Sequence, residues 1–143
     1  MEDDRTMRRA LSLILKAEKY DTVTTGSGPR ATRLLERGRY DLLLTDLFVP
    51  APDGLDLFNR WSGELPVLIL TGFAQSPRGM LARGAAGDAF LEKPFSAQTL
   101  RETVAVLLTR GPDRKMGSDE DGVMDSHGNH RGYRIKSKQR RDR

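Results

Sequence analysis

Asp41-Leu42-Leu43-Leu44-Thr45-Asp46 is a short apolar run that ends abruptly on a carboxylate. Consecutive apolar residues over so few positions are typical of a strand buried on both faces, as in a parallel sheet. Ligands of open parallel sheets bind in the crevice at the carboxyl ends of the strands. Asp46 therefore stands where a functional site is expected, provided that other polar residues reach the same edge.

Strand-like and helical segments alternate on both sides of this run. Three further segments are rich in β-branched or other apolar residues and predict strands: residues 20–25, 66–71 and 89–91. Helical spacing and N-capping residues predict five helices: residues 5–19, residues 27–37, and segments that begin at Asp53, Ser76 and Ser96. Met80 and Leu81 are the expected core contacts of the fourth helix. Such alternation predicts an α/β domain with a parallel sheet.

Composition excludes several classes of protein. With 143 residues, one domain is the default, and the absence of cysteine excludes disulfides and thiolate metal sites. No apolar run approaches the roughly 20 residues that span a bilayer. The start, Met1-Glu2-Asp3-Asp4, is acidic, whereas a secretory signal begins with basic residues. We therefore expect a cytoplasmic protein.

Polar residues follow or end three of the predicted strands: Asp46, Thr71 and Lys93. The carboxyl ends of parallel strands lie at one edge of the sheet, so these side chains can converge there. Glu2-Asp3-Asp4 would join them if a strand preceded it. Clustered carboxylates suit a hard cation such as Mg²⁺. Carboxylates with a nearby lysine and threonine are typical of phosphoryl transfer, in which a carboxylate can itself be the nucleophile.

The chain from Glu2 to about Arg110 resembles the receiver domain of bacterial two-component response regulators. The resemblance is carried by five motifs in the family's order and close to its spacing: Glu2-Asp3-Asp4, Asp46, Pro50 with Asp53-Gly54, Thr71-Gly72, and Lys93-Pro94-Phe95. It implies a receiver domain over residues 1–110, with a doubly wound parallel sheet of flavodoxin-like type.

The resemblance also implies a role for each motif. Asp46 would accept a phosphoryl group from a phosphohistidine of a sensor histidine kinase or histidine phosphotransfer protein. Mg²⁺ would be held by Glu2, Asp3, the Asp46 carboxylate and the backbone carbonyl of Phe48. Thr71 and Lys93 would contact the phosphoryl group, with a cis Lys93–Pro94 peptide, and Phe90 would be the switch aromatic. The last two helices and the last strand would form the signalling surface.

One family element is missing from this sequence. The family begins with an apolar strand before the acidic pair, and here only Met1 stands in that place. Five buried apolar residues contribute about 8–15 kcal/mol, which is comparable to a domain's net stability of about 5–15 kcal/mol. The chain is therefore expected to be destabilised beside residues 41–46. The hypotheses are a start further upstream, a strand borrowed from a partner, or a rearranged sheet.

Phe48 and Phe73 are aromatic at positions that flank the phosphoryl group in the family. We expect them to shield an acyl phosphate from water.

Residues 111–143 contain few large apolar residues and are acidic first and basic afterwards. This tail is predicted to be disordered and leaves no room for a DNA-binding output domain. Most of the chain's net charge of +4 lies there, so the charge is weak evidence for nucleic-acid binding.

The function predicted from these motifs is a stand-alone phosphoryl-accepting switch that acts through protein contact. At most it would phosphorylate itself from a phosphodonor and dephosphorylate itself, without being a turnover enzyme. One alternative is a truncated or non-phosphorylated receiver-like interaction module. Another is a Mg²⁺-dependent phosphatase with Asp46 as nucleophile, which would want a second acid where Phe48 stands.

Overall fold

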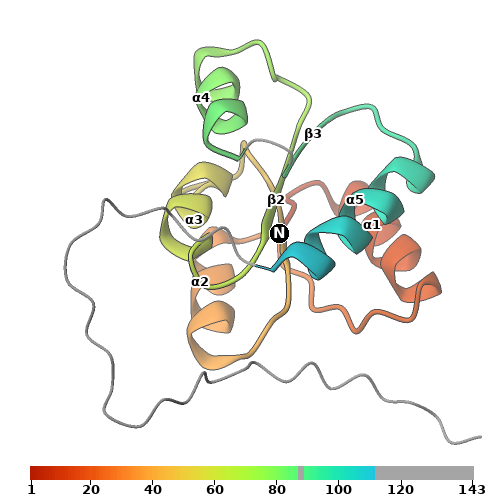
Figure 1. Ribbon diagram of the computed structural model, residues 1–143. Coiled ribbons are helices and arrows are strands. Elements are labelled where there is room, and N and C mark those ends of the chain that lie inside the picture. Colours follow the sequence, from red (N-terminus) through yellow and green to blue (C-terminus); the bar gives the residue numbers. More distant parts are fainter. Residues whose placement is uncertain (87–88, 112–143) are drawn as a thin grey trace, which may run out of the picture.

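Three parallel strands in the order β1-β2-β3 form the centre of the computed structural model, which describes residues 1–86 and 89–111 (Figure 1). The strands are β1 (Leu43–Asp46), β2 (Val67–Thr71) and β3 (Phe90–Glu92). The helices are α1 (Arg5–Ala17), α2 (Gly28–Arg37), α3 (Gly54–Trp61), α4 (Pro77–Ala86) and α5 (Ala97–Arg110). The predicted α/β class with parallel strands is confirmed.

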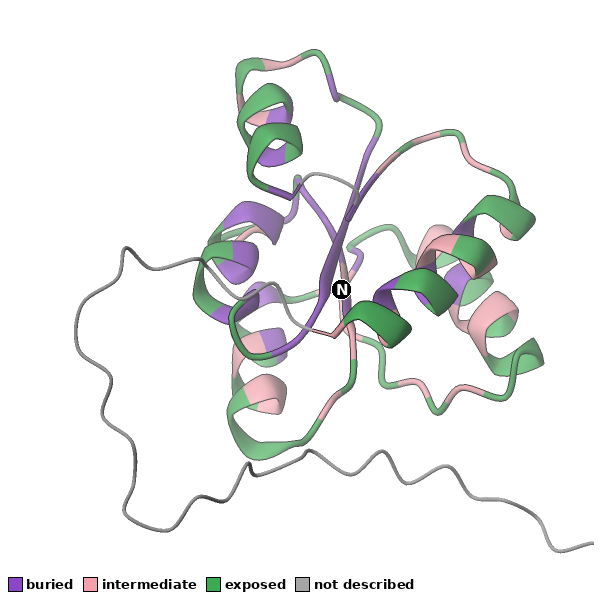
Figure 2. Cartoon of the chain, viewed as in Figure 1, coloured by how far each residue is buried: buried purple, intermediate pink, exposed green. Residues whose placement is uncertain are grey.

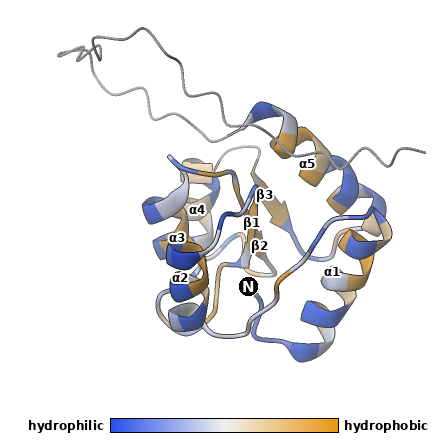
Figure 3. Ribbon diagram, turned by 90° about the horizontal axis from the view of Figure 1, so that it is seen from below, coloured by the Kyte–Doolittle hydropathy of each residue, from blue (hydrophilic) through white to orange (hydrophobic). Residues whose placement is uncertain are grey.

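Helices cover both faces of the sheet. α2, α3 and α4 lie on one side and α1 and α5 on the other, as Figures 1 and 3 both show. β2, between the other two strands, is buried along its whole length, and Figure 2 shows it as a continuous buried ribbon. A strand enclosed on both faces needs apolar residues at consecutive positions, which explains the Val67-Leu68-Ile69-Leu70 sequence.

Side-chain oxygen atoms start all five helices of the described residues. Asp4, Ser27, Asp53, Ser76 and Ser96 each accept a hydrogen bond from a backbone amide two or three residues later. Such caps satisfy amide groups that have no partner inside the helix. The starts predicted at Ser27, Asp53, Ser76 and Ser96 are therefore confirmed. The first residue of α3, Gly54, packs closely against the end of β1. A Cβ on Gly54 would lie only 2.4 Å from the Asp46 carbonyl oxygen.

The strand predicted over residues 20–25 is wrong, because this segment forms no regular ladder in the structure. Its Thr25 carbonyl accepts one hydrogen bond, from the Glu2 amide at 3.1 Å. Among the residues that the structure describes, Met1 alone occupies the position beside β1, where its ammonium donates to the Leu44 carbonyl and its own carbonyl accepts from the Asp46 amide. A strand exists only with a neighbour to pair with, and one residue cannot supply it.

The predicted core contacts of α4 are also wrong. Met80 and Leu81 are 62% and 66% exposed. The helix instead buries small residues against the sheet: Gly79, Ala82 and Ala86. A Cβ on Gly79 would lie 2.3 Å from a carbonyl oxygen of the preceding loop. Close approach of α4 to that loop therefore selects small residues and turns the large ones toward solvent.

The tail predicted to be disordered lies outside the described residues, apart from Gly111, which caps α5 with a φ of 75°. Within the described residues, no helix combines the length and apolar character needed to cross a membrane.

Candidate functional site

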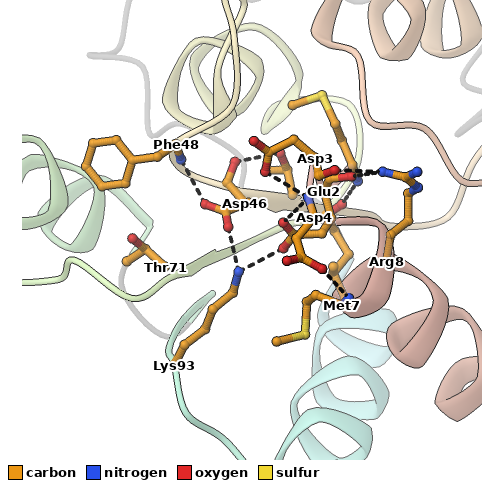
Figure 4. Close-up of polar contacts among 12 residues, drawn as sticks. Glu2, Asp3, Asp4, Met7, Arg8, Asp46, Phe48, Thr71 and Lys93 are labelled. Carbon is orange, nitrogen blue, oxygen red and sulfur yellow. Dashed lines mark hydrogen bonds and ion pairs between the residues drawn. The ribbon is translucent and has the colours of Figure 1, made fainter.

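Asp46 ends β1 with a carboxylate that is largely buried and has two different partners. One oxygen, Oδ1, accepts a hydrogen bond from the Phe48 amide at 2.8 Å. The other, Oδ2, lies 2.5 Å from the Lys93 ammonium (Figure 4). Only 8% of the residue remains exposed. The loop after β1 thus turns back on its own carboxylate and holds it in one orientation.

Lys93 joins two carboxylates that are far apart in the sequence. Its ammonium donates to Asp46 and also to Glu2 Oε2 at 2.8 Å. The backbone of Lys93 is tied to β2 through a 2.8 Å hydrogen bond from its amide to the Thr71 carbonyl. The Lys93–Pro94 peptide is cis, as the sequence resemblance implied.

The acidic turn before α1 brings two more carboxylates to Asp46. Glu2 is 2% exposed, whereas Asp3 is open to solvent. One carboxylate oxygen from each of Glu2, Asp3 and Asp46 lies within 4.8 Å of the others. The neighbouring Met1 ammonium is buried, and desolvation lowers its pKa to about 6 despite the nearby charges of Glu2 and Asp46.

Electrostatic coupling shifts the pKa values of both partners of this ion pair. Burial raises the pKa of Glu2, the hydrogen bond from Lys93 lowers it, and the charge of Asp46 raises it again, leaving it above the ordinary value. Burial alone would lower the pKa of Lys93, but its hydrogen bonds to Asp46 and Glu2 outweigh that effect and raise it. Lys93 is therefore charged at neutral pH, and its ammonium donates to two carboxylates, those of Glu2 and Asp46.

The donor set fits a hard divalent cation. Three carboxyl groups converge within 4.8 Å, and Lys93 pairs with two of them, Glu2 and Asp46. Oxygen ligands of this type are those that Mg²⁺ prefers. The Phe48 amide donates a hydrogen bond to the Asp46 carboxylate, and coordination of Mg²⁺ by the Phe48 carbonyl stays a prediction.

Thr71 ends β2 and is fully buried, with its hydroxyl oxygen accepting a 3.0 Å hydrogen bond from the Phe73 amide. It lies one position beyond Leu70, which is the partner of Asp46 in the sheet register. The same turn geometry thus follows both strands, because each end residue accepts a bond from the amide two positions later.

The structure places the three aromatic residues predicted for this site in two different environments. The rings of Phe48 and Phe73 meet edge to face with centroids 5.6 Å apart, at 39% and 68% exposure. Phe90 begins β3 and is buried, with the guanidinium carbon of Arg83 5.8 Å from its ring centroid. The switch role expected for Phe90 stays a prediction.

Sequence reasoning missed the contribution of Arg8. Its guanidinium donates to the carbonyl oxygens of Glu2 and Asp3 at 2.6 and 3.1 Å. A pattern search finds charge partners for an arginine, but these acceptors are backbone atoms that any residue would offer. One usable signal was the position of Arg8 one helical turn after the Asp4 cap.

Comparison with known proteins gives consistent results. A family model described as the response regulator receiver domain matches residues 1–105. Sensory transduction protein RegX3 of Mycolicibacterium smegmatis is 27% identical over 128 residues, which cover 88% of this chain and 56% of that protein. Transcriptional regulatory protein PmrA of Pectobacterium parmentieri is 33% identical over 113 residues, which cover 77% and 51%. The chain thus spans about half the length of these curated relatives.

Solved structures of the same architecture include a response regulator receiver protein from Burkholderia phymatum. It superposes with a TM-score of 0.65 at 26% identity, covering 76% of this chain and 91% of that one. The doubly wound, flavodoxin-like prediction is confirmed by this similarity.

Proposed function

The chain belongs to the receiver domain family of two-component response regulators, and we propose that it is a phosphoryl-accepting switch whose acceptor is Asp46. The supporting observation is the environment of that carboxylate. It is buried at a strand end, an ammonium lies 2.5 Å from one oxygen, and two further carboxyl groups lie within 4.8 Å. A purely structural carboxylate would need none of the additional acids.

In the proposed reaction an oxygen of Asp46 attacks the phosphorus of a phosphohistidine. A bond forms between this oxygen and phosphorus, the bond from phosphorus to the imidazole nitrogen breaks, and the electron pair returns to the imidazole. The product is an acyl phosphate on Asp46. The partner would be a sensor histidine kinase or a histidine phosphotransfer protein.

Glu2, Asp3 and Asp46 would hold Mg²⁺, together with the Phe48 carbonyl. The ion would supply neutralisation of the charge on the phosphoryl oxygens. Lys93 starts from a position between Glu2 and Asp46, so its ammonium is close enough to pair with a phosphoryl oxygen there. The Thr71 hydroxyl currently accepts a bond from the Phe73 amide, and its own proton can be donated to the phosphoryl group.

Output would follow from contacts on α4, β3 and α5, with residues 1–110 as the receiver unit. The curated relatives are about twice as long as the matched segment, and some of them are named DNA-binding response regulators. Two arrangements are therefore proposed for the switch. In one the receiver is joined to a second domain, and in the other it stands alone and acts through protein contact.

The rival function is a non-phosphorylated interaction module of the same fold. The two differ in one measurement: intact-mass spectrometry after incubation with acetyl phosphate and Mg²⁺. The proposal predicts the mass of one added phosphoryl group in the original protein and none in Asp46→Ala. Folded protein that gains no mass would favour the interaction module.

A further inference from the structure

Arg8 lies in the first turn of α1 and faces back toward the acidic turn (Figure 4). A single guanidinium nitrogen, Nη1, donates to the carbonyl oxygens of Glu2 at 2.6 Å and of Asp3 at 3.1 Å. These are the two residues of the turn whose carboxylates lie next to Asp46. Arg8 therefore holds the backbone from which both carboxylates project, without contacting either carboxylate itself.

Gly26 provides the room that this guanidinium needs. A Cβ built on Gly26 would lie 2.6 Å from Arg8 Nη1 and 3.4 Å from the Glu2 carbonyl oxygen. The residue before it, Thr25, accepts the Glu2 amide at 3.1 Å. The backbone of Glu2 is thus fixed on both sides: its amide by Thr25 and its carbonyl by Arg8.

We propose that Arg8 is a positioning residue for the cation site, which sets the direction of the Glu2 and Asp3 carboxylates by clamping their carbonyls. This inference rests on the proposed function, because it concerns the Mg²⁺ that Glu2, Asp3 and Asp46 would hold. Groups that orient metal ligands without touching the metal typically change metal affinity by about 10- to 100-fold when they are removed.

The sign of the effect separates positioning from charge. The guanidinium carries a positive charge, so by charge alone it repels a nearby cation. If charge dominated, removing it would strengthen Mg²⁺ binding. If the clamp dominates, removing it lets the acidic turn move and weakens Mg²⁺ binding.

The test is a calorimetric titration of unphosphorylated protein with MgCl₂, comparing the original chain with Arg8→Met and Arg9→Met. Methionine also has a long side chain and is a good helix former, so the helix itself should not be weakened. Arg9 is the matched control, since it is the next residue of the same helix, carries the same charge and is exposed. We expect the Mg²⁺ dissociation constant to rise by about 10-fold or more in Arg8→Met, the lower end of the range for such groups, and to stay unchanged in Arg9→Met.

Gly26→Ala tests the clamp without altering Arg8. The backbone of Gly26 does not have the positive φ that would exclude alanine, and the atom that its Cβ would displace is the mobile end of the arginine. We expect Gly26→Ala to weaken Mg²⁺ binding in the same direction. The double variant with Arg8→Met should be no weaker than Arg8→Met alone, because both changes break the same contact.

A second readout distinguishes positioning from general damage. Phosphorylation by acetyl phosphate should need more Mg²⁺ in Arg8→Met, yet reach the original rate at saturating Mg²⁺. Unchanged or tighter Mg²⁺ binding in Arg8→Met and Gly26→Ala overturns the inference while leaving the proposed function intact. Absence of Mg²⁺ binding and of phosphorylation in the original protein would overturn both.

Discussion

Replacing Lys93 with methionine removes the ammonium that donates to both Glu2 and Asp46. The Lys93 side chain is 19% exposed, and its two carboxylate partners are 3% and 12% exposed. Breaking a buried ion pair by removing one partner costs about 3–5 kcal/mol, because the remaining charge is left uncompensated. Since Lys93 retains some contact with water, we expect the lower end, about 3 kcal/mol of unfolding free energy. That is a large fraction of a typical total of about 5–15 kcal/mol.

Mg²⁺ should restore much of this loss. The freed carboxylates of Glu2 and Asp46 no longer share an ammonium, so a cation meets less competition there. A ligand present at 100 times its dissociation constant stabilises the folded state by about 2.7 kcal/mol. We therefore expect Mg²⁺ to stabilise Lys93→Met more than the original protein.

The assay is urea unfolding in MgCl₂ or in EDTA, followed by fluorescence. Trp61 is the single tryptophan of the chain and is buried on α3, so its emission reports the loss of the core. Lys16→Met is the control, because Lys16 is exposed in the last turn of α1. An unfolding midpoint for Lys93→Met equal to the original in EDTA, with no response to Mg²⁺, would refute the reasoning.

Three further predictions concern the same edge. Gly54→Ala would place a Cβ 2.4 Å from the Asp46 carbonyl oxygen and should lower the free energy of unfolding in urea by about 1–3 kcal/mol. Gly63→Ala is the control, because a Cβ at Gly63 would meet open space. Equal unfolding midpoints for the two variants would contradict this prediction. Phe48→Asn removes one ring of the Phe48–Phe73 pair and should shorten the half-life of the acyl phosphate, measured by mass spectrometry after donor removal, and an unchanged half-life would count against shielding. Because the pKa of Glu2 is raised in the folded state, metal-free folded protein binds the proton of the Glu2 carboxyl group more tightly than unfolded protein does. Glu2 therefore contributes stability below about pH 4.5, and this stability is lost as the pH rises through the raised pKa. Urea unfolding across pH should show a shallower dependence for Glu2→Gln, and parallel curves would exclude the effect.

The residues at the edge of the sheet were predictable because two simple regularities coincide there. Apolar runs identify buried strands, and parallel strands bring their final residues to one edge. Asp46, Thr71 and Lys93 therefore followed from the end of each run, and the hydrogen bond between the Lys93 amide and the Thr71 carbonyl joins two of them directly.

What could not be predicted depends on neighbours rather than on local pattern. Residues 20–25 have the composition of a strand, but in the described part of the chain Met1 alone fills the adjacent position beside β1. Which face of α4 is buried depends on how closely the helix approaches the preceding loop. This close approach leaves room for Gly79, but not for a large side chain such as that of Met80, on the buried face. The contact of Arg8 uses carbonyl acceptors, which leave no trace in side-chain patterns.

The most direct test of the account locates the phosphoryl group itself. Protein treated with acetyl phosphate and Mg²⁺ is reduced with borohydride, which converts an aspartyl phosphate to homoserine, and is then mapped by peptide mass spectrometry. The account predicts homoserine at position 46 and aspartate at Asp41, Asp53 and Asp56. Homoserine at one of those other positions, or aspartate at all four in folded protein, would contradict it.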